Sequence, residues 1–123
     1  MKKNFKQIAE QSMTLSRLHN GRDKVETSEI VDKPLTVEDF DLVVRDDGVQ
    51  YAVLTFKELP GAYYNGGLII TKMVVAWVSE YDGNVDDAAA DYAKAKDNER
   101  VKIQLAETKA ASSNHNLTTV KLL

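Results

Sequence analysis

Two segments near the middle of the chain alternate between apolar and polar residues, a pattern that predicts two half-buried β-strands. The first segment spans residues 35–45 and the second spans residues 49–57. The alternation of the first segment is interrupted near Glu38 and Asp39, where we expect a β-bulge or a bend. The two segments are therefore predicted to pair as an antiparallel hairpin.

The turn of this hairpin is set by the requirement that the apolar residues of both strands meet on one face. A two-residue loop would pair Val44 with Tyr51 and place the two apolar sets on opposite faces. A three-residue loop over residues 46–48 instead pairs Val44 with Gln50, with Gly48 in the left-handed conformation that such loops need. The residues that this register brings together in the predicted core are Phe40, Leu42, Ala52, Leu54 and Phe56.

The rest of the chain predicts helices on both sides of the hairpin and a second pair of strands at the end. Residues 68–81 are apolar on nearly all sides, which favours a buried helix, although their β-branched residues leave a buried strand over 68–75 as an alternative. Residues 58–67 contain Pro, Gly and paired tyrosines and predict a loop. The remaining predicted elements are a helix over residues 4–16, a helical turn over residues 27–31, an alanine-rich helix over residues 85–96, and strands over residues 101–106 and 118–122 joined by a polar loop.

This order of elements indicates one domain over residues 1–123 of the α+β class, mainly β with helices. Residues 1–34 form its N-terminal helix and loop, and residues 35–123 form its body. Two strand pairs separated by helices outline an OB-like small barrel of antiparallel strands. In this prediction the barrel has an N-terminal helix and one or two helices inserted between its strand pairs.

The net charge of −3 is unevenly distributed along the chain. Residues 79–99 hold seven acidic and two basic residues, a net charge of −5, which leaves +2 for the remainder. One acidic segment therefore offsets a mildly basic body, which is compatible with an anionic ligand. The first residues lack the apolar region of a signal peptide, and no apolar run is long enough to span a membrane. We therefore expect a cytoplasmic protein with no membrane partner.

The residue types that carry catalysis or bind metals are absent or isolated. The chain has no cysteine, which excludes a disulfide scaffold, a thiolate metal site and a cysteine nucleophile. His19 and His115 have no partner at metal-ligand spacing, and we expect both in exposed loops. The common nucleotide-binding, nucleophile and zinc motifs do not occur. We therefore expect no enzyme, no cofactor and no metal.

Two stretches carry a resemblance to a known family. The first contains YAVLTFKELPGAYYNGG, from Tyr51 to Gly67, ahead of the predicted apolar helix, and the second is VKIQLAETKAASSNHNLTTVKLL, from Val101 to Leu123. With the first strand they resemble a family of small single-stranded-DNA-binding proteins of bacteriophages and mobile elements. The resemblance covers residues 35–123. It implies an OB-type fold and non-catalytic binding of single-stranded DNA in replication or recombination, within a bacterial host and beside phage replication or recombination proteins.

Most of the candidate DNA-binding residues are side chains of the predicted strands that we expect to point away from the core; the others are the adjacent Tyr63 and Tyr64 of the predicted loop, of which one usually packs inward. Aromatic rings stack on bases and cations follow the phosphate backbone, and the paired tyrosines of the predicted loop would close over the strand. Small barrels also pair through exposed strands, so we expect a homo-oligomer, with a dimer as the simplest form. The predicted nucleic-acid-binding residues are Arg45, Tyr51, Thr55, Lys57, Tyr63, Tyr64, Lys102 and Lys121.

Two features of the sequence keep other interpretations open. Asp39 and Asp41 are expected on the same outward face, where carboxylates repel phosphate. Tyr51 on a half-exposed strand is also a common packing residue. The alternative function is a phage protein-interaction module or inhibitor that uses the acidic helix over residues 82–97.

Overall fold

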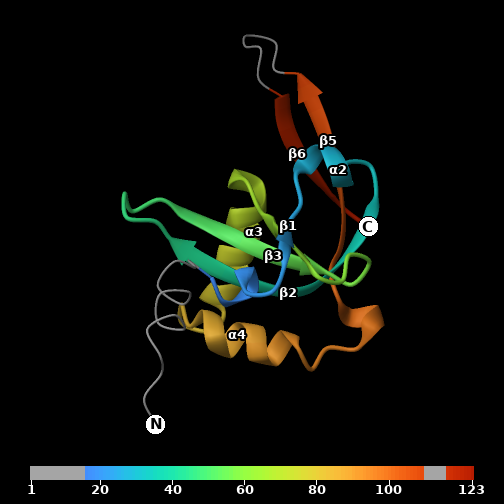
Figure 1. The fold of residues 1–123 in the computed structure, drawn as a ribbon. Coiled ribbons are helices and arrows are strands. Elements are labelled where there is room, and N and C mark those ends of the chain that lie inside the picture. The colour runs from blue at the N-terminus through green and yellow to red at the C-terminus, as the bar shows by residue number, and fades with distance from the viewer. Residues whose placement is uncertain (1–15, 110–115) are drawn as a thin grey trace.

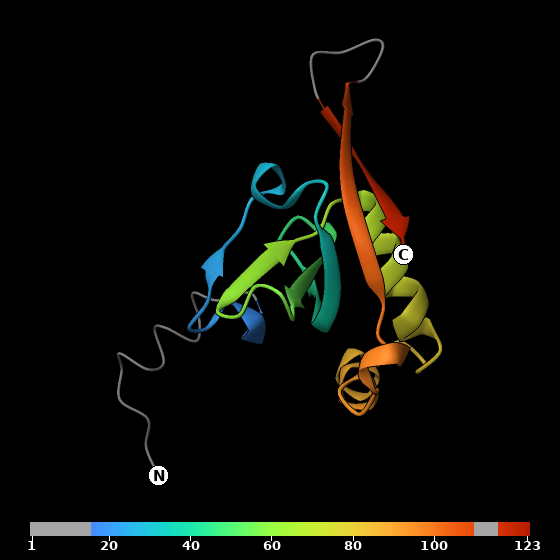
Figure 2. The same ribbon diagram turned by 90° about the vertical axis from the view of Figure 1, so that its right-hand side faces the viewer.

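The structure, a computed structural model, describes residues 16–109 and 116–123. Six strands form one sheet in the order β1-β4-β3-β2-β5-β6 (Figure 1). The β5–β6 hairpin projects beyond the rest of the molecule in both ribbon views (Figures 1 and 2). The elements in chain order are η1 (Arg17–His19), β1 (Asp23–Lys24), α2 (Thr27–Ile30), β2 (Pro34–Val44), β3 (Gln50–Phe56), β4 (Ala62–Asn65), α3 (Leu68–Ser79), α4 (Val85–Tyr92), η2 (Asp97–Glu99), β5 (Lys102–Lys109) and β6 (Asn116–Leu122).

Strand β2 is the centre of the sheet because it pairs with a different strand at each of its ends. Its first residues pair with β5, and the residues after Val37 pair with β3, both antiparallel. The register shifts between Val37 and Asp39, which confirms the bulge predicted there. Extra residues at a bulge bend a strand, and here the bend lies where β2 changes partners.

The register of the β2–β3 hairpin is the predicted one. Val44 lies opposite Gln50, and the core positions pair as expected, with Leu42 opposite Ala52. The amide of Arg45 donates to the carbonyl of Val49, which closes a loop of residues 46–48. Gly48 has a φ of 84°, the left-handed conformation that the loop length required.

Strand β4 corrects the prediction of a loop over residues 58–67. The chain turns at Gly61, and the next four residues form β4, in which Tyr64 lies opposite Leu54 of β3 and Asn65 lies opposite Val53. Strand β1 was also not predicted, and it extends the sheet by pairing in parallel with β4. Segments of two and four residues are too short to show an alternating pattern, so their neighbours in the fold determine their conformation.

Helices α3 and α4 cover one side of the sheet, whereas η1 lies on the other side (Figure 2). The predicted helix over residues 68–81 is confirmed as α3, but its apolar residues are not all buried. Ile70, Val74 and Val78 enter the main core, while Leu68 and Ile69 face outward. Helix α4 is shorter than predicted and begins at Val85, after the N-cap residue Asn84, whose side chain accepts a hydrogen bond from the amide of Asp87.

The α+β class is confirmed, and the sheet is open rather than closed into a barrel. Strands β4, β3, β2, β5 and β6 follow the strand order of an open OB-like sheet, with α3 and α4 between β4 and β5 in the chain. The helical turn predicted near Thr27 is present as α2, with Ile30 buried. Apart from Ser16, the helix predicted over residues 4–16 lies outside the described residues, as does most of the loop before β6.

The close approach of α3 to β4 gives a test of this packing. In Gly66→Ala the added Cβ would lie 2.4 Å from Cγ2 and 2.9 Å from Cβ of Ile70, a stiff and buried side chain. We expect the free energy of unfolding in urea to fall by about 1–3 kcal/mol. Gly67→Ala is the matched control, because its added Cβ meets no atom within 4 Å. Equal losses in the two variants would contradict the packing described here.

Candidate nucleic-acid interface

An N-terminal strap, residues 16–25, crosses the side of the sheet that the sequence predicts to bind DNA. Its Leu18 is only 1% exposed and packs with Val43 and Val53 in a small core separate from the main one. Tyr51 and Tyr63 are half-buried against this cluster. Strand β3 is consequently buried on both faces, and the predicted open face is only partly open.

The strap also forms hydrogen bonds with the two outward carboxylates, those of Asp39 and Asp41. Arg17 donates two hydrogen bonds to the carboxylate of Asp39, at 2.8 and 3.0 Å, and a third to the carbonyl of Phe40. The bond to Asp39 raises the pKa of the Arg17 guanidinium. The hydroxyl of Ser16 donates to Asp41 at 2.7 Å. Both carboxylates are therefore occupied by groups of the same chain.

Three rings form an aromatic strip, defined here as His19, Tyr51 and Tyr63, along the edge of the strap. The ring centroids of His19 and Tyr63 lie 4.5 Å apart. Burial raises the pKa of the Tyr51 phenol, and the nearby charges of Arg45 and Lys24 partly oppose that rise. Two cations, Arg45 and Lys24, and the carboxylate of Asp41 are thus close enough to Tyr51 to affect it electrostatically.

Both cations beside the strip are held in exposed ion pairs. Arg45 contacts Asp47 at 2.7 Å, and Lys24 contacts Glu26 at 3.5 Å. Exposed pairs contribute about 0–1 kcal/mol each, so a phosphate group competes with them at little cost. The imidazole Nε2 of His19 is buried and has no hydrogen-bond partner within the described part of the chain.

Two of the predicted site residues are buried: this corrects the outward placement of Thr55 and the loop position predicted for Tyr64. Thr55 is 3% exposed, opposite Asp39 on the strap side of the sheet. Tyr64 is also 3% exposed, and its hydroxyl forms a 2.7 Å hydrogen bond with Thr27. Burial raises the pKa of this phenol. Tyr64 is therefore a core residue of β4 rather than part of a lid.

The predicted lysines lie away from the aromatic strip. Lys57 contacts Asp97 at 2.8 Å. It shares a cavity of about 540 Å³ with Lys102, and this cavity is also lined by Glu58. Lys121 is exposed on the edge strand β6, opposite Gln104. Because a strand rises about 3.3 Å per residue, Lys57 is roughly 20 Å along the chain direction from Tyr51.

Three neighbours of the site do not follow from the sequence pattern: Arg17, His19 and Lys24. One signal was present, since residues 51–56 contain no charge on either face and such runs are typical of strands buried on both sides. That signal indicates a cover over the outer face of β3 but does not identify the segment that supplies it. The contact between the strap and β2 joins residues more than twenty positions apart in the chain.

Comparison with known proteins adds no assignment: no family model matches the chain, and it has no significant match among curated proteins or solved structures. The helices that the structure describes are too short or too polar to span a bilayer. Within residues 16–109 and 116–123, no group of three or more His, Cys, Asp or Glu side chains is arranged to hold a metal ion.

The strap can be tested by comparing a buried apolar contact with an exposed ion pair. Leu18→Ala should lower the free energy of unfolding by about 2–4 kcal/mol, because it leaves a cavity between the strap and the sheet. Arg17→Ala should cost about 1 kcal/mol or less, because its pair with Asp39 is partly exposed. Urea denaturation measures both values. If Leu18→Ala costs no more than Arg17→Ala, the strap is not packed as described.

Proposed function

We propose that the protein binds single-stranded DNA without catalysis, through the aromatic strip and the cations Lys24 and Arg45. The observation that carries the proposal is the gathering of three rings and two cations on one side of the sheet. Bases stack on aromatic side chains with little sequence preference, each contributing about 1–3 kcal/mol, and cations follow the phosphates. The half-buried tyrosines are held in place by Leu18, so little conformational entropy is lost when a base stacks on them.

The position of the strip in the fold supports the same function. OB-folds bind oligonucleotides on the face of their second and third strands. In the OB-like strand order seen here these strands are β3 and β4, which carry Tyr51 and Tyr63. The guanidinium of Arg17 offsets the charge of Asp39 and so reduces its repulsion of phosphate, whereas the Ser16 hydroxyl that donates to Asp41 is neutral and offsets no charge.

The biological setting is proposed from the family resemblance. It places the protein in phage or mobile-element DNA replication or recombination, in the cytoplasm of a bacterial host. The proposed assembly is a homo-oligomer, with a dimer as the simplest form. A dimer would bring two strips together and double the number of phosphate contacts. Lys57, Lys102 and Lys121 lie outside the strip and become secondary candidates that depend on such an assembly.

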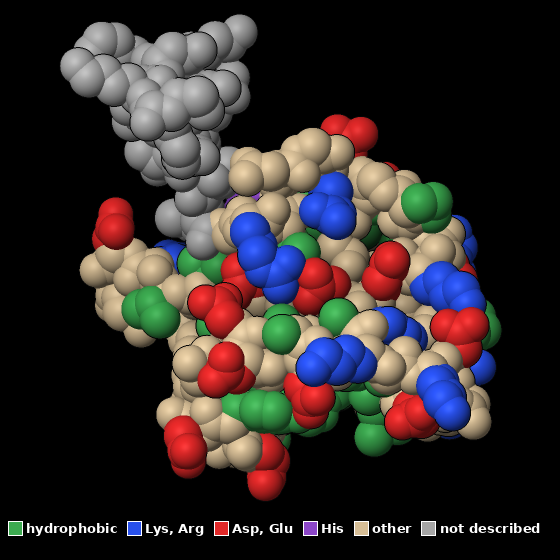
Figure 3. All heavy atoms as spheres, turned by 90° about the horizontal axis from the view of Figure 1, so that it is seen from below, with side chains coloured by type: hydrophobic (Ala, Val, Ile, Leu, Met, Phe, Trp, Pro, Cys, Tyr) green, Lys and Arg blue, Asp and Glu red, His purple; other side chains and the backbone are tan. Residues whose placement is uncertain are grey.

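The alternative, a protein-interaction module that uses the acidic segment, needs a different surface. Helix α4 lies at the bottom of Figure 1, and Figure 3 views the molecule from that side. Acidic and basic side chains are interspersed across this face (Figure 3). A mimic of nucleic acid requires a continuous negative surface, so the mixed charges favour single-stranded DNA binding over mimicry.

Titration of fluorescein-labelled oligo-dT, followed by anisotropy, tests the proposed function. We expect saturable binding at low salt that weakens as salt rises. Two phosphate contacts predict a slope of about −1.4 in log K against log salt, or about a sevenfold loss between 50 and 200 mM. Absence of binding at low salt would contradict the proposal.

A tyrosine substitution that keeps its packing separates stacking from folding. In Tyr51→Leu the apolar contact with Leu18 is retained but the ring is lost, so oligo-dT affinity should fall about 5- to 150-fold. Tyr81→Leu is the matched control, because Tyr81 lies on the α3–α4 side of the molecule. Thermal melts of both variants verify folding. The strip is not the binding site if Tyr81→Leu weakens binding as much as Tyr51→Leu.

A further inference from the structure

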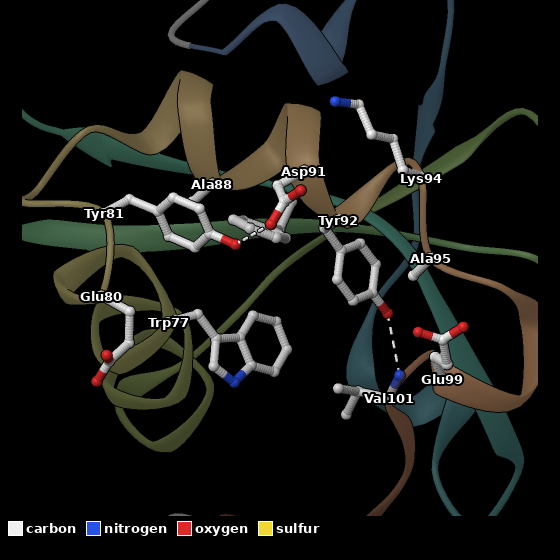
Figure 4. A pocket seen from close by; sticks show the side chains of 11 residues that line it. Trp77, Glu80, Tyr81, Ala88, Asp91, Tyr92, Lys94, Ala95, Glu99 and Val101 are labelled. Atoms are coloured by element: carbon white, nitrogen blue, oxygen red, sulfur yellow. Dashed lines mark hydrogen bonds between the residues drawn. The ribbon is translucent and has the colours of Figure 1, made fainter.

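A cavity lined by residues of β2, α3 and α4 lies on the side of the sheet opposite the aromatic strip. Its volume is about 590 Å³, within the range of small-ligand sites. The rings of Trp77, Tyr81 and Tyr92 surround it (Figure 4), and Phe40 of β2 also lines it. Trp77 and Tyr81 are half-buried, so part of each ring remains accessible.

The charges around this cavity are predominantly negative. Its lining includes the carboxylates of Glu80, Asp91 and Glu99 and the cation Lys94, a net charge of −2, which the guanidinium of Arg100 beside the Tyr92 ring reduces to −1. Among the described residues none of these charged side chains takes part in an ion pair. Asp91 accepts a short hydrogen bond from the Tyr81 hydroxyl, which holds its carboxylate beside the rings (Figure 4).

A guanidinium group already stacks on one of these rings within the chain. The guanidinium carbon of Arg100 lies 5.2 Å from the ring centroid of Tyr92. Trp77 and Tyr92 are themselves stacked, with centroids 6.0 Å apart and planes 9° apart. Because Arg100 and Trp77 both contact Tyr92, the aromatic surface left for a ligand is chiefly that of Trp77 and Tyr81.

We propose that this cavity receives an arginine side chain of a partner protein. A planar guanidinium stacks on aromatic faces and pairs with carboxylates, and the cavity offers both groups. The net negative charge disfavours a phosphate group, and hence the DNA proposed for the other face. An uncharged apolar ligand would form no electrostatic interaction with the carboxylates of the cavity.

The proposed arginine site and the aromatic strip are on opposite sides of strand β2. Phe40 lines the cavity, whereas its neighbours Asp39 and Asp41 contact the strap. Alternate residues of a strand point to opposite faces, so the two ligands do not compete for space. This arrangement lets a partner protein bind while the strip holds single-stranded DNA, and the arginine site does not depend on the proposed DNA binding.

Trp77 provides a direct probe of the cavity, because it is the only tryptophan of the chain. The ligand for the test is an acetylated and amidated Gly-Arg-Gly peptide, and the control is the same peptide with citrulline, which has the shape of arginine without its charge. We expect a saturable change in Trp77 fluorescence, and a shift of its indole N–H resonance, with the arginine peptide. The citrulline peptide should bind at least about fivefold more weakly.

Charge-neutralising variants locate the site. Glu99→Gln and Asp91→Asn should each weaken the arginine peptide severalfold. Asp46→Asn makes the same charge change in the exposed β2–β3 turn and should have no effect. Equal binding of the citrulline peptide, an equal loss in Asp46→Asn, or the absence of both spectroscopic changes would overturn the proposal. Competition by unlabelled oligo-dT would also overturn it, because it would assign the cavity to DNA.

Discussion

The bulge in strand β2 is the constraint on which the rest of the structure depends. The bulge takes the backbone carbonyls beside it out of regular pairing with β3. These carbonyls then accept hydrogen bonds from other parts of the chain. The hydroxyl of Tyr92 donates to the carbonyl of Val37 at 2.7 Å, and Arg100 donates to that of Glu38 at 2.8 Å. The amide of Val101 in turn donates to the Tyr92 hydroxyl. These bonds attach the end of α4 and the start of β5 to the sheet, and they fix the ring that forms one wall of the aromatic cavity.

Strand β3 shows how much of the fold could be predicted from the sequence. Its pairing with β2 was predictable because only one loop length unites the apolar residues, and one glycine was available for the left-handed position of that loop. The burial of β3 on both faces does not follow from its pattern, because alternation of apolar and polar residues indicates a strand with one buried face. Thr55 illustrates the difference, since a polar residue in an outward register was expected to be exposed and is covered. The cover comes from the strap, whose few apolar residues carry no pattern that identifies their target.

The candidate site was predictable in its residue types more than in its arrangement. Tyr51 lies within electrostatic range of Arg45 and of Tyr63, because the hairpin register and the adjacent strand β4 place these residues on the same side of the sheet. Tyr64 was misplaced because one residue along a strand reverses the direction of a side chain, and the existence of β4 was not predicted. His19 and Lys24 are brought to the site by contacts between distant parts of the chain. Local sequence patterns contain no information on such contacts.

The two proposed ligand sites share one strand and so depend on one register. Phe40 lines the cavity formed with α3 and α4. Asp41, the next residue, contacts the strap on the side of the aromatic strip. A shift of β2 by one residue would expose Phe40 to the strap and place Asp41 within the apolar core, at a cost of several kcal/mol for an unpaired carboxylate. The bulge before this segment is anchored by Tyr92 and Arg100, which prevents such a shift. Tyr92, which lines the cavity, therefore also helps to hold the register that presents the aromatic strip, and this coupling keeps the two proposed sites on opposite sides of the sheet.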